Sequence, residues 1–169
     1  KINIIIFLLP LFLSAQQKPN IILIFADDLG YKDVGFTGTK IFETPNIDLL
    51  SKRGMIFTNA YAGAGNCAPS RACLLSGQYS PRHGVYAVGS TTRGPKEKMR
   101  VLPVKNTNYL AANYVTIAEA LKTQGYATGI FGKWHLGNHP DVLPEAQGFD
   151  VYFDSRRDNP IKKRVEPED

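Results

Sequence analysis

The run from Asn20 to Ala26 reads Asn-Ile-Ile-Leu-Ile-Phe-Ala and carries no charge. A continuous apolar run that is rich in β-branched residues is typical of a strand buried on both faces, as in the centre of a parallel sheet. Two aspartates, Asp27 and Asp28, follow directly. We therefore expect an α/β fold built around this strand, with the two carboxylates at its carboxyl end.

Local signals along the chain predict an alternation of helices and strands. Thr44 and Pro45 begin a helix that ends at Arg53 before Gly54, and residues 116–119 form a capping box that begins a helix ending near Gly125. Residues 55–61 and 126–131 are predicted strands. Such alternation indicates an open sheet covered by helices on both faces. Residues 80–113, rich in Gly, Pro, Thr and charge, are expected to form a long surface excursion, a kind of loop that is usually functional.

The segment from Cys67 to Gly77 reads Cys-Ala-Pro-Ser-Arg-Ala-Cys-Leu-Leu-Ser-Gly. Pro69 suits the first turn of a helix and Gly77 suits its C-cap, so a helix is predicted to start at Cys67. Free N–H groups and the helix dipole favour negative charge at such a terminus. Arg71 lies one turn further on. The pattern indicates a nucleophile in an anion-binding cradle.

The chain has two cysteines, Cys67 and Cys73, and their spacing excludes several classes of cysteine chemistry. A tyrosine phosphatase needs arginine six positions after its cysteine, where this chain has Cys73. A redox dithiol needs Cys-x-x-Cys, which is absent. A disulfide across one short helix is awkward for the usual Cα separation. We interpret Cys73 as a small buried helix residue, whereas Cys67 is either reactive or a buried hydrophobe too.

Three blocks of the sequence together resemble the signatures of the type I sulfatases, and they occur in that family's order. In chain order they are Lys18–Gly30, which contains the aspartate pair, Cys67–Gly77, and Gly125–His135, which ends in Gly-Lys-Trp-His. The resemblance implies an alkaline-phosphatase-like fold, that is, an open, mostly parallel sheet with helices on both faces. The stretches Trp134–Pro140 and Glu145–Asp150 are similar, more weakly, to the arylsulfatase and N-acetylgalactosamine-6-sulfatase branch.

The resemblance also implies roles for six residues. Cys67 would be oxidised to formylglycine by a formylglycine-generating enzyme or an anaerobic maturase. Asp27, Asp28 and the residue derived from Cys67 would bind Ca²⁺, with Mg²⁺ as the alternative. Three further catalytic residues are implied: Arg71 and Lys133 would offset charge on the sulfate and His135 would act as a base. The expected reaction is hydrolysis of sulfate esters of polysaccharides, glycosaminoglycans or aryl alcohols through a formylglycine hydrate.

Residue by residue, blander interpretations exist. Asp-Asp-Leu-Gly is good turn chemistry, Arg71 could be a solvated helix residue, and Lys133 and His135 could be structural residues at a strand end. Two other functions also stay open: a phosphonate or phosphate monoester hydrolase of the same superfamily, and an inactive anion-binding fragment. Members of this family have several hundred residues, and they supply further metal ligands, a second active-site histidine and a second lysine later in their chains. Residues 18–169 are therefore expected to be the N-terminal portion of a catalytic domain, incomplete and inactive alone.

Charge and the first residues bear on partners and location. Lysine and arginine number 20 against 15 aspartates and glutamates, a net charge of +5, which suits an anionic substrate. No nucleic-acid recognition motif accompanies this excess. Residues 1–17 combine an apolar core, too short to span a bilayer stably, with the small residues Ser14 and Ala15. This is the pattern of a signal peptide, so export to the periplasm or the extracellular space is expected; a buried N-terminal strand is the alternative.

Overall fold

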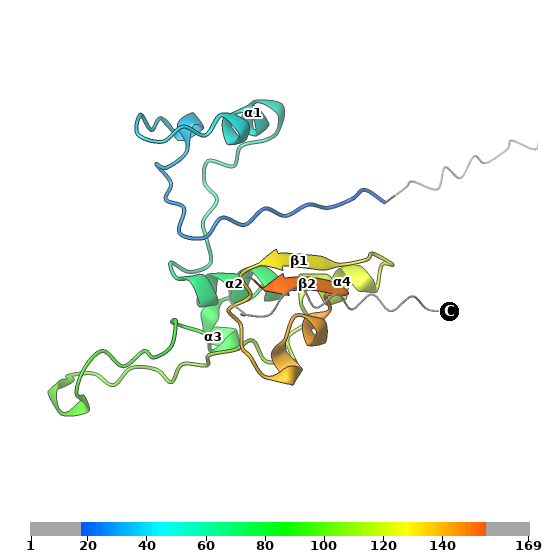
Figure 1. The fold of residues 1–169 in the computed structure, drawn as a ribbon. Helices are drawn as coiled ribbons and strands as arrows, with labels where there is room; N and C mark the ends of the chain where they lie inside the picture. Colours follow the sequence, from blue (N-terminus) through cyan, green and yellow to red (C-terminus); the bar gives the residue numbers. More distant parts are fainter. Residues whose placement is uncertain (1–17, 155–169) are drawn as a thin grey trace, which may run out of the picture.

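The computed structural model describes residues 18–154, and the predicted signal peptide, residues 1–17, lies outside the described residues. Ten elements follow one another along this part of the chain, with two strands late in the order (Figure 1). They are η1 (Gly35–Thr37), α1 (Pro45–Arg53), α2 (Cys67–Ser76), α3 (Ser80–His83), η2 (Lys96–Lys98), α4 (Ile117–Lys122), β1 (Gly129–Gly132), η3 (Pro140–Val142), η4 (Glu145–Gln147) and β2 (Val151–Asp154).

The two strands form a parallel pair, which agrees with the expected α/β class. Gly129 of β1 pairs with Val151 of β2, and the register runs to Gly132 opposite Asp154. Asp150 anchors the start of the pair, because its carboxylate accepts hydrogen bonds from the backbone N–H of Thr128 at 2.8 Å and from the Thr128 hydroxyl at 2.9 Å. The predicted strand 126–131 is thus confirmed in its second half, and it begins three residues later than expected.

The core packs α2 and α4 against the residues that follow β1. Its buried members are Ala68, Ala72, Leu75, Val85, Leu110, Ala118, Trp134, Leu136 and Phe149. The Trp134 indole N–H donates to the Val142 carbonyl at 3.0 Å, and its ring meets Phe149 edge-on at 6.1 Å. This packing fixes the segment after β1 against the helix that begins with Cys67.

All three predicted helices are present. The helix 45–53 matches α1, and α2 begins at Cys67 and ends at Ser76, followed by Gly77, whose left-handed φ of 64° makes it the expected C-cap. At α4, Thr116 accepts the Glu119 N–H at 3.2 Å while the Glu119 carboxylate accepts the Thr116 N–H at 2.7 Å, which confirms the capping box. No helix within residues 18–154 has the length and apolar content that crossing a membrane requires.

Two predicted strands are wrong for the described part of the chain. Residues 20–26 and 55–61 belong to no ladder within residues 18–154, and their apolar side chains are exposed, with Ile22 at 86% and Ile24 at 81%. Figure 1 shows the first segment as a long extended stretch beside the body that holds β1 and β2. A strand needs a neighbour for its backbone groups, and the described residues provide none here.

The predicted excursion 80–113 is only partly a surface feature. Residues around η2 extend away from the body (Figure 1), and most of residues 90–105 are exposed. However, both ends of the excursion turn inward, since His83, Val85, Ala87 and Leu110 are buried. The excursion therefore contributes to the core as well as to the surface.

Candidate functional site

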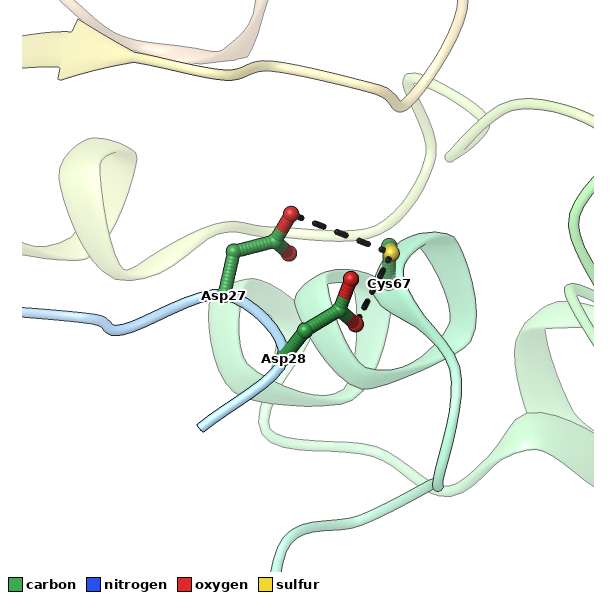
Figure 2. A group of neighbouring side chains, drawn as sticks. All are labelled: Asp27, Asp28 and Cys67. Atoms are coloured by element: carbon green, nitrogen blue, oxygen red, sulfur yellow. Dashed lines mark hydrogen bonds between the residues drawn. The ribbon is translucent and has the colours of Figure 1, made fainter. Parts of the chain in front are cut away.

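Asp27, Asp28 and Cys67 converge at the start of α2. Figure 2 shows both carboxylates pointing toward the Cys67 sulfur from the loop that follows the extended segment. The Cys67 thiol lies 3.9 Å from Asp27 Oδ2 and 3.8 Å from Asp28 Oδ1, and the three potential ligand atoms all lie within 4.8 Å of one another. Asp28 has a φ of 57°, the left-handed conformation that turns the chain sharply after Asp27. The loop thus presents two adjacent carboxylates to one point.

The helix start positions Cys67 through its backbone and through close packing of the preceding loop. Asn66 is the N-cap in an extended conformation, and its carbonyl accepts the Ser70 N–H at 3.0 Å. A Cβ added at Gly63 would lie 2.6 Å from the Cys73 Cβ, so the loop before α2 approaches the helix as only glycine allows. Cys67 is half-buried at this N-terminus, where the helix dipole favours negative charge.

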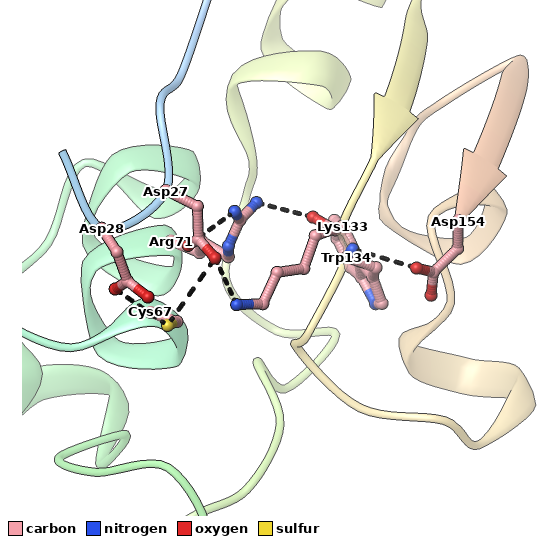
Figure 3. Close-up of polar contacts among 7 residues, drawn as sticks. All are labelled: Asp27, Asp28, Cys67, Arg71, Lys133, Trp134 and Asp154. Atoms are coloured by element: carbon pink, nitrogen blue, oxygen red, sulfur yellow. Dashed lines mark hydrogen bonds and ion pairs between the residues drawn. The ribbon is translucent and has the colours of Figure 1, made fainter. Parts of the chain in front are cut away.

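Arg71 and Lys133 both bind Asp27. Arg71 donates from Nη2 to Asp27 Oδ1 at 3.0 Å and from Nη1 to the Lys133 carbonyl at 2.6 Å, while Lys133 Nζ pairs with Asp27 Oδ2 (Figure 3). The guanidinium also lies over the Phe25 ring, 5.0 Å from its centroid. The two cations come from α2 and from the residue after β1, so Asp27 joins elements that are remote in sequence.

These ion pairs shift the protonation of the site. The hydrogen bond from Lys133, supported by Arg71, lowers the pKa of Asp27 to about 2 against a weaker opposing effect of desolvation. The same hydrogen bond from Asp27 raises the pKa of Lys133. At neutral pH the Asp27 carboxylate is therefore ionised and the Lys133 ammonium is charged. An ionised carboxylate can bind a cation, and a charged ammonium can bind an anion.

His135 lies on the neighbouring wall rather than among these ion pairs. It follows the buried Trp134 and adopts a φ of 63°, which is uncommon outside glycine and is held here by the packing of Trp134 and Leu136. His135 lines a cavity together with Ala68, the residue after Cys67, and Asp154 at the end of β2. The structure thus brings five of the six predicted residues together at the start of α2, whereas His135 lies on the wall of a cavity that Ala68 also lines.

One polar pair beside the site was not anticipated. Cys73 is buried and unbridged, as predicted, and its sulfur lies 3.5 Å from His83 Nε2. His83 Nδ1 accepts the Val85 N–H at 3.1 Å, so Nε2, the nitrogen near the sulfur, carries the proton of the neutral ring. Desolvation lowers the pKa of His83, which keeps the ring neutral. No local pattern around His83 signals this contact, because it depends on how α3 packs on α2.

The donor set at Asp27 and Asp28 fits a hard divalent cation in part. Carboxylate oxygens are the preferred ligands of Ca²⁺ and Mg²⁺, each of which takes at least about six ligands. A thiol is a soft ligand and suits neither ion. An oxygen at the position of the Cys67 sulfur would complete a set of hard donors, so the residues present fit such a cation once Cys67 is converted to an oxygen-bearing side chain.

A family model described as "Sulfatase" matches residues 19–167. The chain belongs to the sulfatase family. Relatives of this sulfatase chain include human arylsulfatase G, which is 41% identical over 137 residues, covering 81% of this chain and 24% of the relative. Mouse N-acetylgalactosamine-6-sulfatase is 40% identical over 145 residues, covering 84% of this chain and 26% of the relative. The chain therefore spans about a quarter of the length of these relatives.

Solved structures of other sulfatases share the fold. The crystal structure of Ps i-CgsB superposes with a TM-score of 0.66 at 42% sequence identity, covering 82% of this chain and 28% of that one. The structure of the same protein in complex with k-i-k-neocarrahexaose gives the same values. The expected fold class is confirmed: the described residues form part of the α/β fold of these sulfatases, although only two of its strands are paired here.

Proposed function

We propose that the protein containing this chain hydrolyses sulfate esters, with Cys67 as the precursor of a formylglycine nucleophile and Asp27 and Asp28 as metal ligands. The observation that carries the proposal is the convergence of these three side chains within 4.8 Å at a helix N-terminus. Membership of the sulfatase family supports the reaction class. A bound divalent cation, Ca²⁺ or Mg²⁺, would polarise the sulfate oxygens, and a hydrated formylglycine would supply a hydroxyl nucleophile and later release sulfate by elimination.

The chain's own side chains would orient and neutralise the substrate. Arg71 has a rigid fork of donors, and Lys133 is held charged by its contact with Asp27, so both can bind the oxygens of a sulfate monoester. The two cations are positioned before substrate arrives, which is the condition for effective electrostatic stabilisation. His135, which lines the same cavity as Ala68, would be the base that takes a proton.

The donor chemistry favours conversion of Cys67 over an unmodified thiol. Asp27 and Asp28 offer hard oxygen ligands, and a sulfur between them is mismatched to the cations that such ligands bind. An aldehyde hydrate at the same position would remove this mismatch. The sequence Cys-Ala-Pro-Ser-Arg around Cys67 resembles the one read by formylglycine-generating enzymes or anaerobic maturases, which we therefore propose as partners.

Desulfation of the full-length protein tests the proposal. Wild-type protein co-expressed with a formylglycine-generating enzyme should release sulfate from an ester with multiple turnovers, and the tryptic peptide containing Cys67 should be lighter by about 18 Da, the change from thiol to aldehyde. Cys67→Ser should abolish multiple turnover, because a sulfated serine has no second hydroxyl on the same carbon and so cannot expel sulfate by elimination. Cys73→Ser serves as the matched control for cysteine loss, since Cys73 touches neither carboxylate. Undiminished turnover by Cys67→Ser would refute the mechanism.

Rates on matched sulfate and phosphate esters separate this function from the rival phosphoester hydrolase, for which phosphate should react faster. The carbohydrate substrate class is supported by relatives: Ps i-CgsB was solved with a neocarrahexaose, and the mouse relative is an N-acetylgalactosamine-6-sulfatase. We therefore place sulfated polysaccharides or glycosaminoglycans ahead of aryl sulfates as substrates.

We further propose that residues 18–169 form the first portion of a longer catalytic domain and that residues 1–17 direct export. The exposed apolar segment 20–26 supports the first point, since further strands would cover it. Calcium titration checks it: the isolated 169-residue chain should bind weakly, and tight one-to-one binding would contradict it. N-terminal sequencing of the exported protein checks the second point, with a start after about residue 15 as the expected result.

A further inference from the structure

A cavity of about 750 Å³ opens beside the Cys67 cluster. Its lining includes Ala68, Ala87, Val88, Asn108, His135 and Asp154. Two walls bear directly on the proposed chemistry, since Ala68 follows Cys67 in α2 and His135 is the expected base. The third wall comes from the two inward-turning ends of the excursion 80–113. A volume of this size is ordinary for a site that encloses a small organic ligand.

The side chain of Asn106 holds the residues of that third wall in place. Its Oδ1 accepts the backbone N–H groups of Tyr86 at 2.7 Å and Ala87 at 3.0 Å. Its Nδ2 donates to the carbonyls of Ala87 at 3.1 Å and Gly89 at 2.7 Å. Because the backbone groups on each side differ in kind, they fix which end of the Asn106 amide is oxygen and which is nitrogen.

This orientation dictates how Asn108 faces the cavity. Asn106 Nδ2 also lies 2.7 Å from Asn108 Oδ1, so its two hydrogens are shared among three acceptors, and the oxygen of the Asn108 amide is turned toward Asn106. The other end of the planar amide, Nδ2, then carries the donors that remain. Within residues 18–154, no acceptor lies at hydrogen-bonding distance of this nitrogen. Asn108 is exposed and lines the cavity, so its N–H groups are available to a ligand there.

We propose that this cavity binds the sugar ring that bears the sulfate group, and that Asn108 is a specificity-determining residue that donates a hydrogen bond to a hydroxyl or ring oxygen of that sugar. The inference rests on the proposed sulfatase function and names the substrate subsite. Three features of the wall match a neutral carbohydrate: the amide donor, the Asp154 carboxylate as an acceptor for hydroxyl groups, and the small apolar side chains of Ala87 and Val88 for the C–H face of a ring. The carboxylate also disfavours a second anionic group on the same ring.

The test compares two substrates in the full-length protein: N-acetylgalactosamine 6-sulfate or a carrageenan oligosaccharide, whichever wild-type protein hydrolyses faster, and 4-nitrocatechol sulfate, which has no sugar. Loss of one hydrogen bond corresponds to about a fivefold to tenfold change. Asn108→Ala should therefore lower the ratio of kcat/KM for the sugar sulfate to kcat/KM for the aryl sulfate by about that factor, with the loss in KM for the sugar. Asn108→Asp should lower the ratio at least as much, because it keeps an acceptor for Asn106 and loses the donors.

Asn113→Ala is the matched control, since Asn113 is exposed in the turn before α4 and lines no part of the cavity. Its ratio should equal that of wild-type protein. An unchanged ratio in Asn108→Ala or in Asn108→Asp would overturn the subsite, and so would hydrolysis of the aryl ester with no turnover of either sugar, while the sulfatase function would stand. Failure of wild-type protein to hydrolyse any sulfate ester would instead overturn the proposed function and the subsite with it.

Discussion

Replacing Asn106 with alanine should loosen two particular amides at the cavity wall. The N–H groups of Tyr86 and Ala87 both donate to Asn106 Oδ1, at 2.7 and 3.0 Å. A hydrogen bond to a partly buried group contributes about 1 kcal/mol net. Since about 1.4 kcal/mol corresponds to a factor of ten, each amide should exchange its hydrogen about fivefold faster in Asn106→Ala.

Hydrogen exchange of the full-length protein, read residue by residue by mass spectrometry with electron-transfer fragmentation, measures this effect. Two nearby amides are internal controls: Val85 N–H donates to His83 Nδ1 at 3.1 Å and Thr107 N–H donates to the Gly84 carbonyl at 2.9 Å, both independent of the Asn106 side chain. They should exchange as in wild-type protein. Unchanged exchange at Tyr86 and Ala87, or equal acceleration of all four amides, would refute the view that Asn106 holds this wall.

Three further outcomes are expected. Thr116→Val should lower the free energy of unfolding by about 2 kcal/mol in urea denaturation, because it removes the N-cap and leaves the buried Gln147 carbonyl without its hydroxyl donor at 2.7 Å. Thr116→Ser should stay near wild type. A loss under about 0.5 kcal/mol in the valine variant would contradict the capping argument. Because the hydrogen bond from Lys122 lowers the pKa of Asp150 below 3.8, the pair should stabilise the fold above that pH and lose its contribution as the pH falls below it. Asp150→Asn should reduce the loss of unfolding free energy at acid pH by less than about 1 kcal/mol, since both groups are more than a third exposed. An unchanged pH dependence would argue against the pair. Chelation by EDTA should abolish desulfation, and added Ca²⁺ or Mg²⁺ should restore it. Asp28→Asn should need at least tenfold more metal for the same recovery. An enzyme that stays active after chelation and contains no metal by elemental analysis would exclude a metal at the carboxylate pair.

The helices were predictable because their signals are local. A capping box involves residues three positions apart, and the glycine at a C-cap answers a backbone requirement at that one position, so Thr116, Glu119 and Gly77 could be read without knowledge of the fold. Strands depend on partners that are distant along the chain. The apolar run 20–26 has strand composition but finds no partner within residues 18–154, and composition alone could not reveal this.

The candidate site shows the same division. The proximity of Asp27, Asp28 and Cys67 agrees with a loop after an apolar run and a helix start, both visible in the sequence, whereas their catalytic roles stay predictions. The contacts of His83 with Cys73 and of Asn106 with residues 86–89 were not foreseen. Each joins segments between ten and twenty residues apart, the first through the packing of α3 on α2 and the second through irregular chain, and no periodicity or motif in the sequence signals either contact.

The double pairing of Asp27 has a consequence for how an ester would be captured. Asp27 and Asp28 carry two negative charges, and Arg71 and Lys133 carry two positive charges, so the net charge of these four side chains is zero. Together they neither attract nor repel an approaching anion strongly. If a divalent ion binds there as proposed, these side chains and the ion would carry a surplus of two positive charges, which would attract a monoanionic ester over roughly a Debye length, about 8 Å at physiological salt. Metal loading would then govern the rate of encounter with the ester as well as the chemistry that follows, and association should slow in high salt only when the ion is bound.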